Sequence, residues 1–237
     1  MIRVTGLMAL LTCVLGLGGC EPAVSPVQPR QRTYFHFLHA HAGAGPLDVE
    51  LETYDEKRTV ASRLQFGTSW PAGGYASLLV DATSDTVIKP GDIQLRLLSH
   101  PDREEVVSPR QLELRAEKYA SYCLIDSFGK SLLIWAVDNF EVPPAGRCNV
   151  RFMNLCSYYR SVTLESKDDT LQISRMAFLN LSSFKTYTTG YRTFYFINDL
   201  AGALIDSVNV VLSPGKTYNL YLTQSDGEAY AGWEVLE

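Results

Sequence analysis

The sequence predicts an all-β fold made of two antiparallel β-sandwich domains in tandem. From Thr33 onward, short apolar or alternating runs are separated by turn residues, and no helical period lasts three turns. The composition agrees, because 13 Tyr, 10 Phe and 3 Trp in 237 residues favour strands over helices. An internal repeat indicates two domains, since the pattern that begins at Tyr34 begins again at Val150. Domains of about 100 residues are large enough to bury a core each.

The first domain is predicted for residues 33–142 and contains eight short strands. The strand candidates are Thr33–His39, Leu47–Tyr54, Val60–Phe66, Tyr75–Asp81, Asp92–Leu98, Val106–Arg115, Lys118–Asp126 and Leu132–Phe140. Turn residues such as Gly73-Gly74 and Pro90-Gly91 separate them. Strands at this spacing are typical of a sandwich of the immunoglobulin-like or transthyretin-like kind.

The second domain is predicted for residues 148–237, after a linker at 143–147. The matched pairs are Phe37 with Phe152, Glu50 with Glu165, Ser62 with Ser174, Phe66 with Phe178, Tyr119 with Tyr218, Tyr122 with Tyr221, and Trp135 with Trp233. The pairs keep their order, and their offset changes only where turns lie. By this alignment, Cys123 corresponds to Leu222, which has the character of a core position.

The N-terminus resembles a bacterial lipoprotein signal peptide. Arg3 supplies the positive charge, Leu7 to Leu17 the apolar segment, and small residues precede Cys20. Residues 1–19 are therefore expected to be removed and the Cys20 thiol to carry acyl chains. A transmembrane helix, which needs about 20 apolar residues, and an ordinary secretory signal are the alternatives. Glu21 after the cysteine favours the outer membrane or cell surface over other destinations.

The tether is predicted for residues 20–32, which include three prolines and no apolar periodicity. In a polyproline-like state, this stretch spans roughly 35–40 Å and holds the folded part off the lipid. The formal net charge is −5, without a block of basic residues. Nucleic-acid binders gather Lys and Arg on one face, so the composition argues against nucleic acid as a partner.

Several segments of the second repeat resemble a bacterial extracytoplasmic family known as the domain of unknown function 4397 (DUF4397). The segments are Val150–Asn154, Val162–Leu164, Gly190-Tyr191 and Ser213–Leu222, and Phe37–Ala40 and Leu47–Val49 correspond to part of them in the first repeat. The family's usual Ser-Pro-Asp is missing from both repeats. The resemblance implies tandem β-sandwiches behind a lipoprotein signal, and it implies no activity.

No motif predicts catalysis or a cofactor. His39 and His41 would lie about 6.6 Å apart on one face of a strand, close enough to share a metal with His36 nearby. The sequence offers no third ligand, and we expect no metal site. His39 takes the position of Asn154 in the second repeat, so we favour a hydrogen bond from either side chain to the backbone of the following loop. Gly129-Lys130-Ser131 lacks the preceding glycine of a phosphate loop and is typical of a hairpin turn.

Three cysteines remain if Cys20 is lipidated, and an odd number leaves at least one thiol free. Cys148 and Cys156 flank one strand and would stand about 26 Å apart, too far to bond. A disulfide would therefore join Cys123 to Cys148 or to Cys156. A buried free thiol at Cys123 is the alternative.

Aromatic residues that do not repeat are the candidates for ligand binding. Tyr158, Tyr159 and Trp70 have no counterpart in the other repeat, whereas the pattern of the matched tyrosines indicates a structural role. Three tripeptides resemble an O-glycosylation motif: Asp85-Thr86-Val87, Asp169-Thr170-Leu171 and Asp206-Ser207-Val208. A solvated turn explains each of them equally well.

The sequence therefore predicts a membrane-anchored lipoprotein with a non-catalytic binding or structural role in the cell envelope. Its partner would be an envelope protein or a glycan, bound by loops on a rigid scaffold. One alternative is an envelope hydrolase or carbohydrate-active accessory protein. Another is a subunit of a surface fibre or secretion assembly, in which a partner completes an exposed edge strand.

Overall fold

The computed structural model describes residues 31–54, 56–80, 93–112, 118–139, 141–167 and 171–236. These ranges form strands joined by turns, with a short 3-10 helix at Ala42–Ala44. None of their helices is long and apolar enough to cross a membrane. Cys20, residues 21–30 of the tether and the Asp-Thr pairs at 85–86 and 169–170 lie outside the described residues, whereas Asp206 and Ser207 belong to a strand.

The first sandwich consists of two sheets within residues 31–138. One sheet has the order β4-β1-β8-β9, with β5 also pairing β1, and the other has the order β3-β2-β6-β7. The strands are β1 (Gln31–Ala40), β2 (Leu47–Glu52), β3 (Lys57–Leu64), β4 (Thr68–Trp70), β5 (Ala76–Val80), β6 (Gln94–Ser99), β7 (Arg110–Gln111), β8 (Tyr119–Ser127) and β9 (Lys130–Asp138). The sequence prediction located these strands closely, except that it missed β4 and expected a longer strand around β7.

The second sandwich repeats this arrangement. Its sheets have the orders β13-β10-β16-β17 and β12-β11-β14-β15. The strands are β10 (Arg147–Asn154), β11 (Ser161–Ser166), β12 (Gln172–Ala177), β13 (Lys185–Thr188), β14 (Gly190–Asn198), β15 (Ala203–Leu212), β16 (Thr217–Ser225) and β17 (Glu228–Val235). The prediction of an all-β fold with sandwiches in tandem is therefore confirmed.

Each sandwich departs from a purely antiparallel arrangement at one position. β1 runs parallel to β8, and β10 runs parallel to β16. These strands are buried on both sides, and buried parallel pairs show near-continuous apolar runs rather than a strict alternation. In β1, each residue of the run Phe35–Ala40 is buried, and four of the six are apolar.

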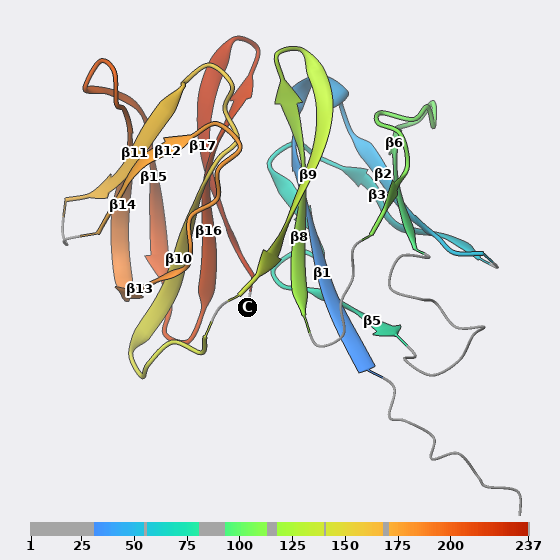
Figure 1. Cartoon of the computed structure of the whole chain (residues 1–237), viewed down its shortest axis with the longest axis horizontal. Coiled ribbons are helices and arrows are strands. Elements are labelled where there is room, and N and C mark those ends of the chain that lie inside the picture. The colour runs from blue at the N-terminus through green and yellow to red at the C-terminus, as the bar shows by residue number, and fades with distance from the viewer. Residues whose placement is uncertain are drawn as a thin grey trace, which may run out of the picture.

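The four sheets stack as four layers, with the β1–β8 sheet facing the β10–β16 sheet at the centre (Figure 1). Side chains alternate along β1, so Phe35 and Phe37 enter the first core while Leu38 and Ala40 face the other sandwich. Met153 and Leu155 meet them from the second sandwich. The two sandwiches therefore share a third apolar core between them.

A buried polar chain crosses the same interface. Arg151 forms an ion pair with Asp138 of the first sandwich, and its Nε donates to Asn219 Oδ1 at 2.9 Å. Asn219 Nδ2 donates to Glu234 Oε1 at 2.7 Å, and Glu234 Oε2 lies 3.1 Å from His36 Nε2 of the first sandwich. Removing one partner of a buried pair costs several kcal/mol, about 3–5 in measured cases. This row of buried polar side chains therefore favours one relative placement of the two sandwiches.

The structure corrects the alignment of the repeat in β8 and β16. Phe37 lies opposite Tyr122, whereas its counterpart Phe152 lies opposite Leu220, so the offset is 98 and not 99. A shift of one residue moves a side chain to the other face of a strand. Tyr122 accordingly enters the first core while Tyr221 faces the interface, and Cys123 corresponds to Tyr221 rather than to Leu222.

Candidate functional site

The aromatic residues selected from the sequence do not form one site. Trp70 lies in β4 of the first sandwich, with its ring 5.2 Å from that of Phe35. Tyr158 and Tyr159 follow β10 in the second sandwich, where Tyr159 packs on the core and Tyr158 is 49% exposed. Trp70 therefore belongs to a different part of the molecule from the two tyrosines.

Trp70 lines a cavity of about 390 Å³ in the first sandwich, at the end where β1 begins and β2 ends. Its apolar lining residues come from both sheets of the sandwich: Leu51, Val60, Trp70, Ala76, Leu78 and Ile93. Its polar lining residues are Thr53, Glu56, Arg58, Thr59 and Ser77. Pockets for small ligands have about 300–1,000 Å³, mostly apolar walls and a few polar groups. The cavity fits this description.

The second sandwich provides an internal comparison for this cavity. Leu78 lies opposite Thr33, and in the equivalent pair Tyr187 lies opposite Cys148. Tyr187 is 3% exposed and packs against Phe194, so it closes its end of the core. Leu78 is smaller and remains partly exposed. The cavity is therefore present where the first repeat has a smaller residue than the second.

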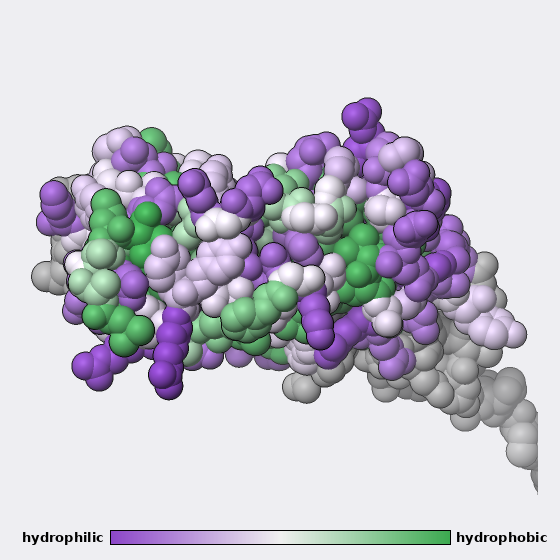
Figure 2. All heavy atoms as spheres, turned by 90° about the horizontal axis from the view of Figure 1, so that it is seen from above, coloured by the Kyte–Doolittle hydropathy of each residue, from purple (hydrophilic) through white to green (hydrophobic). Residues whose placement is uncertain are grey.

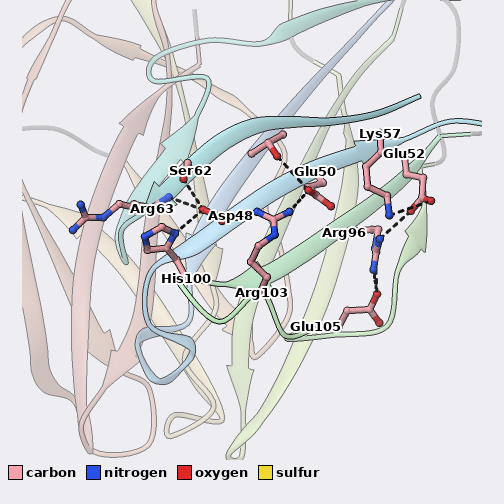
Figure 3. A network of polar contacts seen from close by, with 11 residues as sticks. Asp48, Glu50, Glu52, Lys57, Ser62, Arg63, Arg96, His100, Arg103 and Glu105 are labelled. Carbon is pink, nitrogen blue, oxygen red and sulfur yellow. Dashed lines mark hydrogen bonds and ion pairs between the residues drawn. The ribbon is translucent and has the colours of Figure 1, made fainter. Parts of the chain in front are cut away.

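A charged network covers the outer face of the β2–β6 sheet (Figure 3). Asp48, Glu50 and Glu52 alternate along β2 with core residues and therefore share this face. Arg103 forms ion pairs with Asp48 and Glu50, and Arg96 with Glu52. Their carboxylates are engaged with cations of the same sandwich.

Asp48 is one of the two buried carboxylates of this network, together with Glu50. Ser62 Oγ donates a hydrogen bond to Asp48 Oδ1 at 2.7 Å, and the backbone N–H of Arg63 donates another to the same oxygen at 3.0 Å. His100 Nδ1 lies 3.1 Å from this oxygen. Burial raises the pKa of Asp48, but these hydrogen bonds outweigh it and hold the pKa below its usual value. An acid catalyst needs a raised pKa. We interpret the network as a structural clamp that joins β3 and β6 to β2.

His39 forms the hydrogen bond to the backbone of the following loop that the sequence analysis favoured. His39 Nδ1 accepts a hydrogen bond from the backbone N–H of His41, and Asn154 Oδ1 accepts one from that of Cys156. The second nitrogen of His39 lies 2.7 Å from the carbonyl oxygen of Gly45. Burial lowers the pKa of His39 to about 4. Among the described residues, no group of three metal-ligating side chains occurs.

The disulfide considered for Cys123 is not formed. Cys123, Cys148 and Cys156 are free and buried. Cys123 faces the interface between the two sandwiches, whereas Cys148 and Cys156 lie in the core of the second sandwich. The thiol of Cys123 is therefore in a different layer of the stack from the other two thiols. Burial raises the pKa of Cys148 and of Cys156 to about 11, which makes these thiols poor nucleophiles.

The surface seen from above carries no single large apolar area among the described residues (Figure 2). Hydrophobic residues form separate patches among hydrophilic ones, including a group over the second sandwich. The most exposed leucines among the described residues of that sandwich are Leu200 and Leu204, at 80% and 57%. A groove of about 290 Å³ beside Leu204 is lined by Glu165, Lys167 and Tyr195, among others. Lys167 already lies over the Tyr195 ring, 5.3 Å from its centre.

No protein-family model matches the chain, and the comparison with curated proteins found no match. Among solved structures, it is similar to a carbohydrate-binding module of family CBM26 from Eubacterium rectale Amy13K, solved with maltoheptaose. The identity is 11% and the TM-score 0.25, over 84% of this chain and 95% of that chain. The two C2 domains of extended synaptotagmin 2 match at 8% identity and a TM-score of 0.25, over 99% of this chain and 97% of that chain. Scores this low carry no argument about function.

Proposed function

We propose that this protein is a lipid-anchored binding protein of the bacterial cell envelope, without catalytic activity, and that its ligand site is the cavity beside Trp70. The observation that carries the proposal is the cavity that the described residues leave open at one end of the first sandwich. Val60, Trp70, Ala76 and Leu78 are partly exposed there and line the cavity, while they pack against the buried residues of that core. Apolar surface left open to water in a cavity of this size is stabilised by a ligand that covers it.

The anchor is part of the proposal. The signal-like residues before Cys20 support acylation of that thiol, and the resemblance to the DUF4397 family supports an extracytoplasmic location at the outer membrane or cell surface. Labelling cells with a fatty acid that carries a detectable tag would test this. We expect the label on the native protein and none on Cys20→Ala, which should also leave the membrane fraction. A labelled Cys20→Ala protein would contradict the anchor.

The absence of catalysis is proposed from the engagement of the acidic groups. Asp48 and Glu50 are adjacent, as an acid–base pair would require, but both are held by Arg103 and by hydroxyl groups of β3. Asp138 and Glu234 take part in the interface between the sandwiches. These contacts give each of these four carboxylates a structural role.

The cavity can be tested by closing it as the second sandwich closes its own. In Leu78→Tyr, the larger ring should fill the space, as Tyr187 does in the other repeat. N-phenyl-1-naphthylamine, an uncharged apolar probe, should bind the full chain with Cys20→Ser and fluoresce, and Leu78→Tyr should abolish this signal. Leu200→Tyr, on the exposed surface of the second sandwich, is the matched control and should keep it. Equal binding by both variants would refute the cavity as the site.

A further inference from the structure

Arg58 is the unusual residue of the cavity. It lies directly opposite Leu51, a core residue, so the register places it on the same face of the sheet as Leu51. Its side chain is exposed and lines the mouth of the cavity. No hydrogen bond or ion pair joins its side chain to another described residue, although Glu56 also lines the cavity. A guanidinium group at the mouth of an apolar cavity therefore has unused donors.

The second repeat again provides the comparison. In the first sandwich, Glu50 pairs with Thr59 and the next residues, Leu51 and Arg58, pair with each other. In the second sandwich, Glu165 pairs with Gln172, and the next backbone hydrogen bond joins the N–H of Ser166 to the carbonyl oxygen of Leu171. Leu171 therefore occupies the position that corresponds to Arg58. Leu171 packs against the core there. The first repeat therefore has a cation where the second has a partly buried apolar residue that packs against the core. A structural role in packing does not explain this arginine.

We propose that the ligand of the cavity is an amphiphile with an anionic head group, whose apolar part lies against Trp70 and Leu78 and whose anion pairs with Arg58. This inference rests on the proposed function of the cavity. Arginine binds carboxylate, sulfonate and phosphate groups through two parallel hydrogen bonds, and such charge-assisted bonds are stronger than neutral ones.

The other polar groups at the rim agree with this orientation. The hydroxyl of Thr53 donates to the carbonyl oxygen of Glu56 at 3.1 Å, and that of Thr59 to Glu50 at 3.2 Å, so both are already engaged. Glu56 is exposed and repels an anion. The head group is therefore directed to the Arg58 side of the mouth, and Glu56→Gln should strengthen the binding of an anionic ligand.

Two probes of nearly the same shape separate the charge from the apolar contact. The anionic probe is 8-anilinonaphthalene-1-sulfonate, and the uncharged one is N-phenyl-1-naphthylamine, which lacks the sulfonate. Titrations use the full chain with Cys20→Ser, in buffer without detergent. We expect Arg58→Gln to weaken binding of the anionic probe about tenfold and to change that of the uncharged probe less than about twofold. Arg58→Lys should retain part of the affinity, and Arg160→Gln, an exposed arginine of the second sandwich, should change neither probe.

The outcomes distinguish the two proposals. Equal effects of Arg58→Gln on both probes, or no effect on either, would overturn the anionic head group while leaving the cavity in place. Binding of both probes to Leu78→Tyr with wild-type affinity would refute the cavity itself. Circular dichroism and the urea midpoint of each variant establish that it is folded, because a partly folded chain binds such probes without a site.

Discussion

The pH dependence of stability provides a sharp test of the structure through His39. Burial lowers its pKa from 6.5 to about 4, and the neutral ring accepts a hydrogen bond from the N–H of His41 at Nδ1 and meets the carbonyl of Gly45 at Nε2. A proton at Nδ1 would remove the first of these bonds. Between pH 6.5 and 4, the unfolded chain therefore holds more protons at this position than the folded chain, and stability falls as the pH falls.

The magnitude follows from the size of the shift. Each pKa unit corresponds to about 1.36 kcal/mol, so from pH 7 to pH 5 this residue should cost about 2 kcal/mol of unfolding free energy, and about 3 kcal/mol by pH 4. The variant His39→Asn places the residue of the second repeat at this position. Asn154 accepts the equivalent backbone hydrogen bond there and does not titrate.

The assay is urea unfolding of the wild type and of His39→Asn at pH 7 and pH 5. Other titrating groups are shared by the two proteins, so they cancel in the comparison. We expect the wild type to lose about 2 kcal/mol more than the variant between the two pH values. If both proteins lose the same free energy of unfolding between the two pH values, the description of His39 as a buried, neutral, hydrogen-bonded ring is wrong.

Two further predictions concern the interface and the thiols. Gly232 lies opposite Tyr221, and a Cβ at position 232 would overlap the tyrosine ring. Gly232→Ala should therefore destabilise the protein by about 1–3 kcal/mol in urea unfolding. An unchanged urea midpoint would show that the Tyr221 ring is not held against Gly232. Cys123, Cys148 and Cys156 should resist a thiol reagent in the folded protein and give three reactive thiols in guanidinium; rapid labelling of the folded protein would contradict their burial.

The limits of the sequence are clearest in β8 and β16. Aligning Tyr122 with Tyr221 was reasonable from residue identity, since two tyrosines and a glycine keep the same spacing. The pairing with β1 and β10 shows that the equivalent residues are Cys123 and Tyr221. Because side chains alternate between faces, an error of one residue exchanged a core position for an interface position. The same error placed Cys123 in a core instead of at the interface.

The cavity shows a second limit. Trp70 could be selected from the sequence because it does not repeat, but Arg58 and Leu78 could not. Their meaning depends on Leu171 and Tyr187, which occupy the equivalent positions in the second sandwich. Only the strand register identifies these pairs, since no run of identical residues aligns them.

The sequence by itself determined most of the strands, the hairpin at Gly129, the tandem repeat and the role of His39, because these depend on local patterns of hydrophobicity, turns and short-range hydrogen bonds. The tertiary structure decided the parallel pairs, the shared core between the sandwiches and the partners of Arg151 and Glu234. These features join residues far apart in the chain. A periodic pattern shows that a side chain is buried, but only the packed sheets determine what it is buried against.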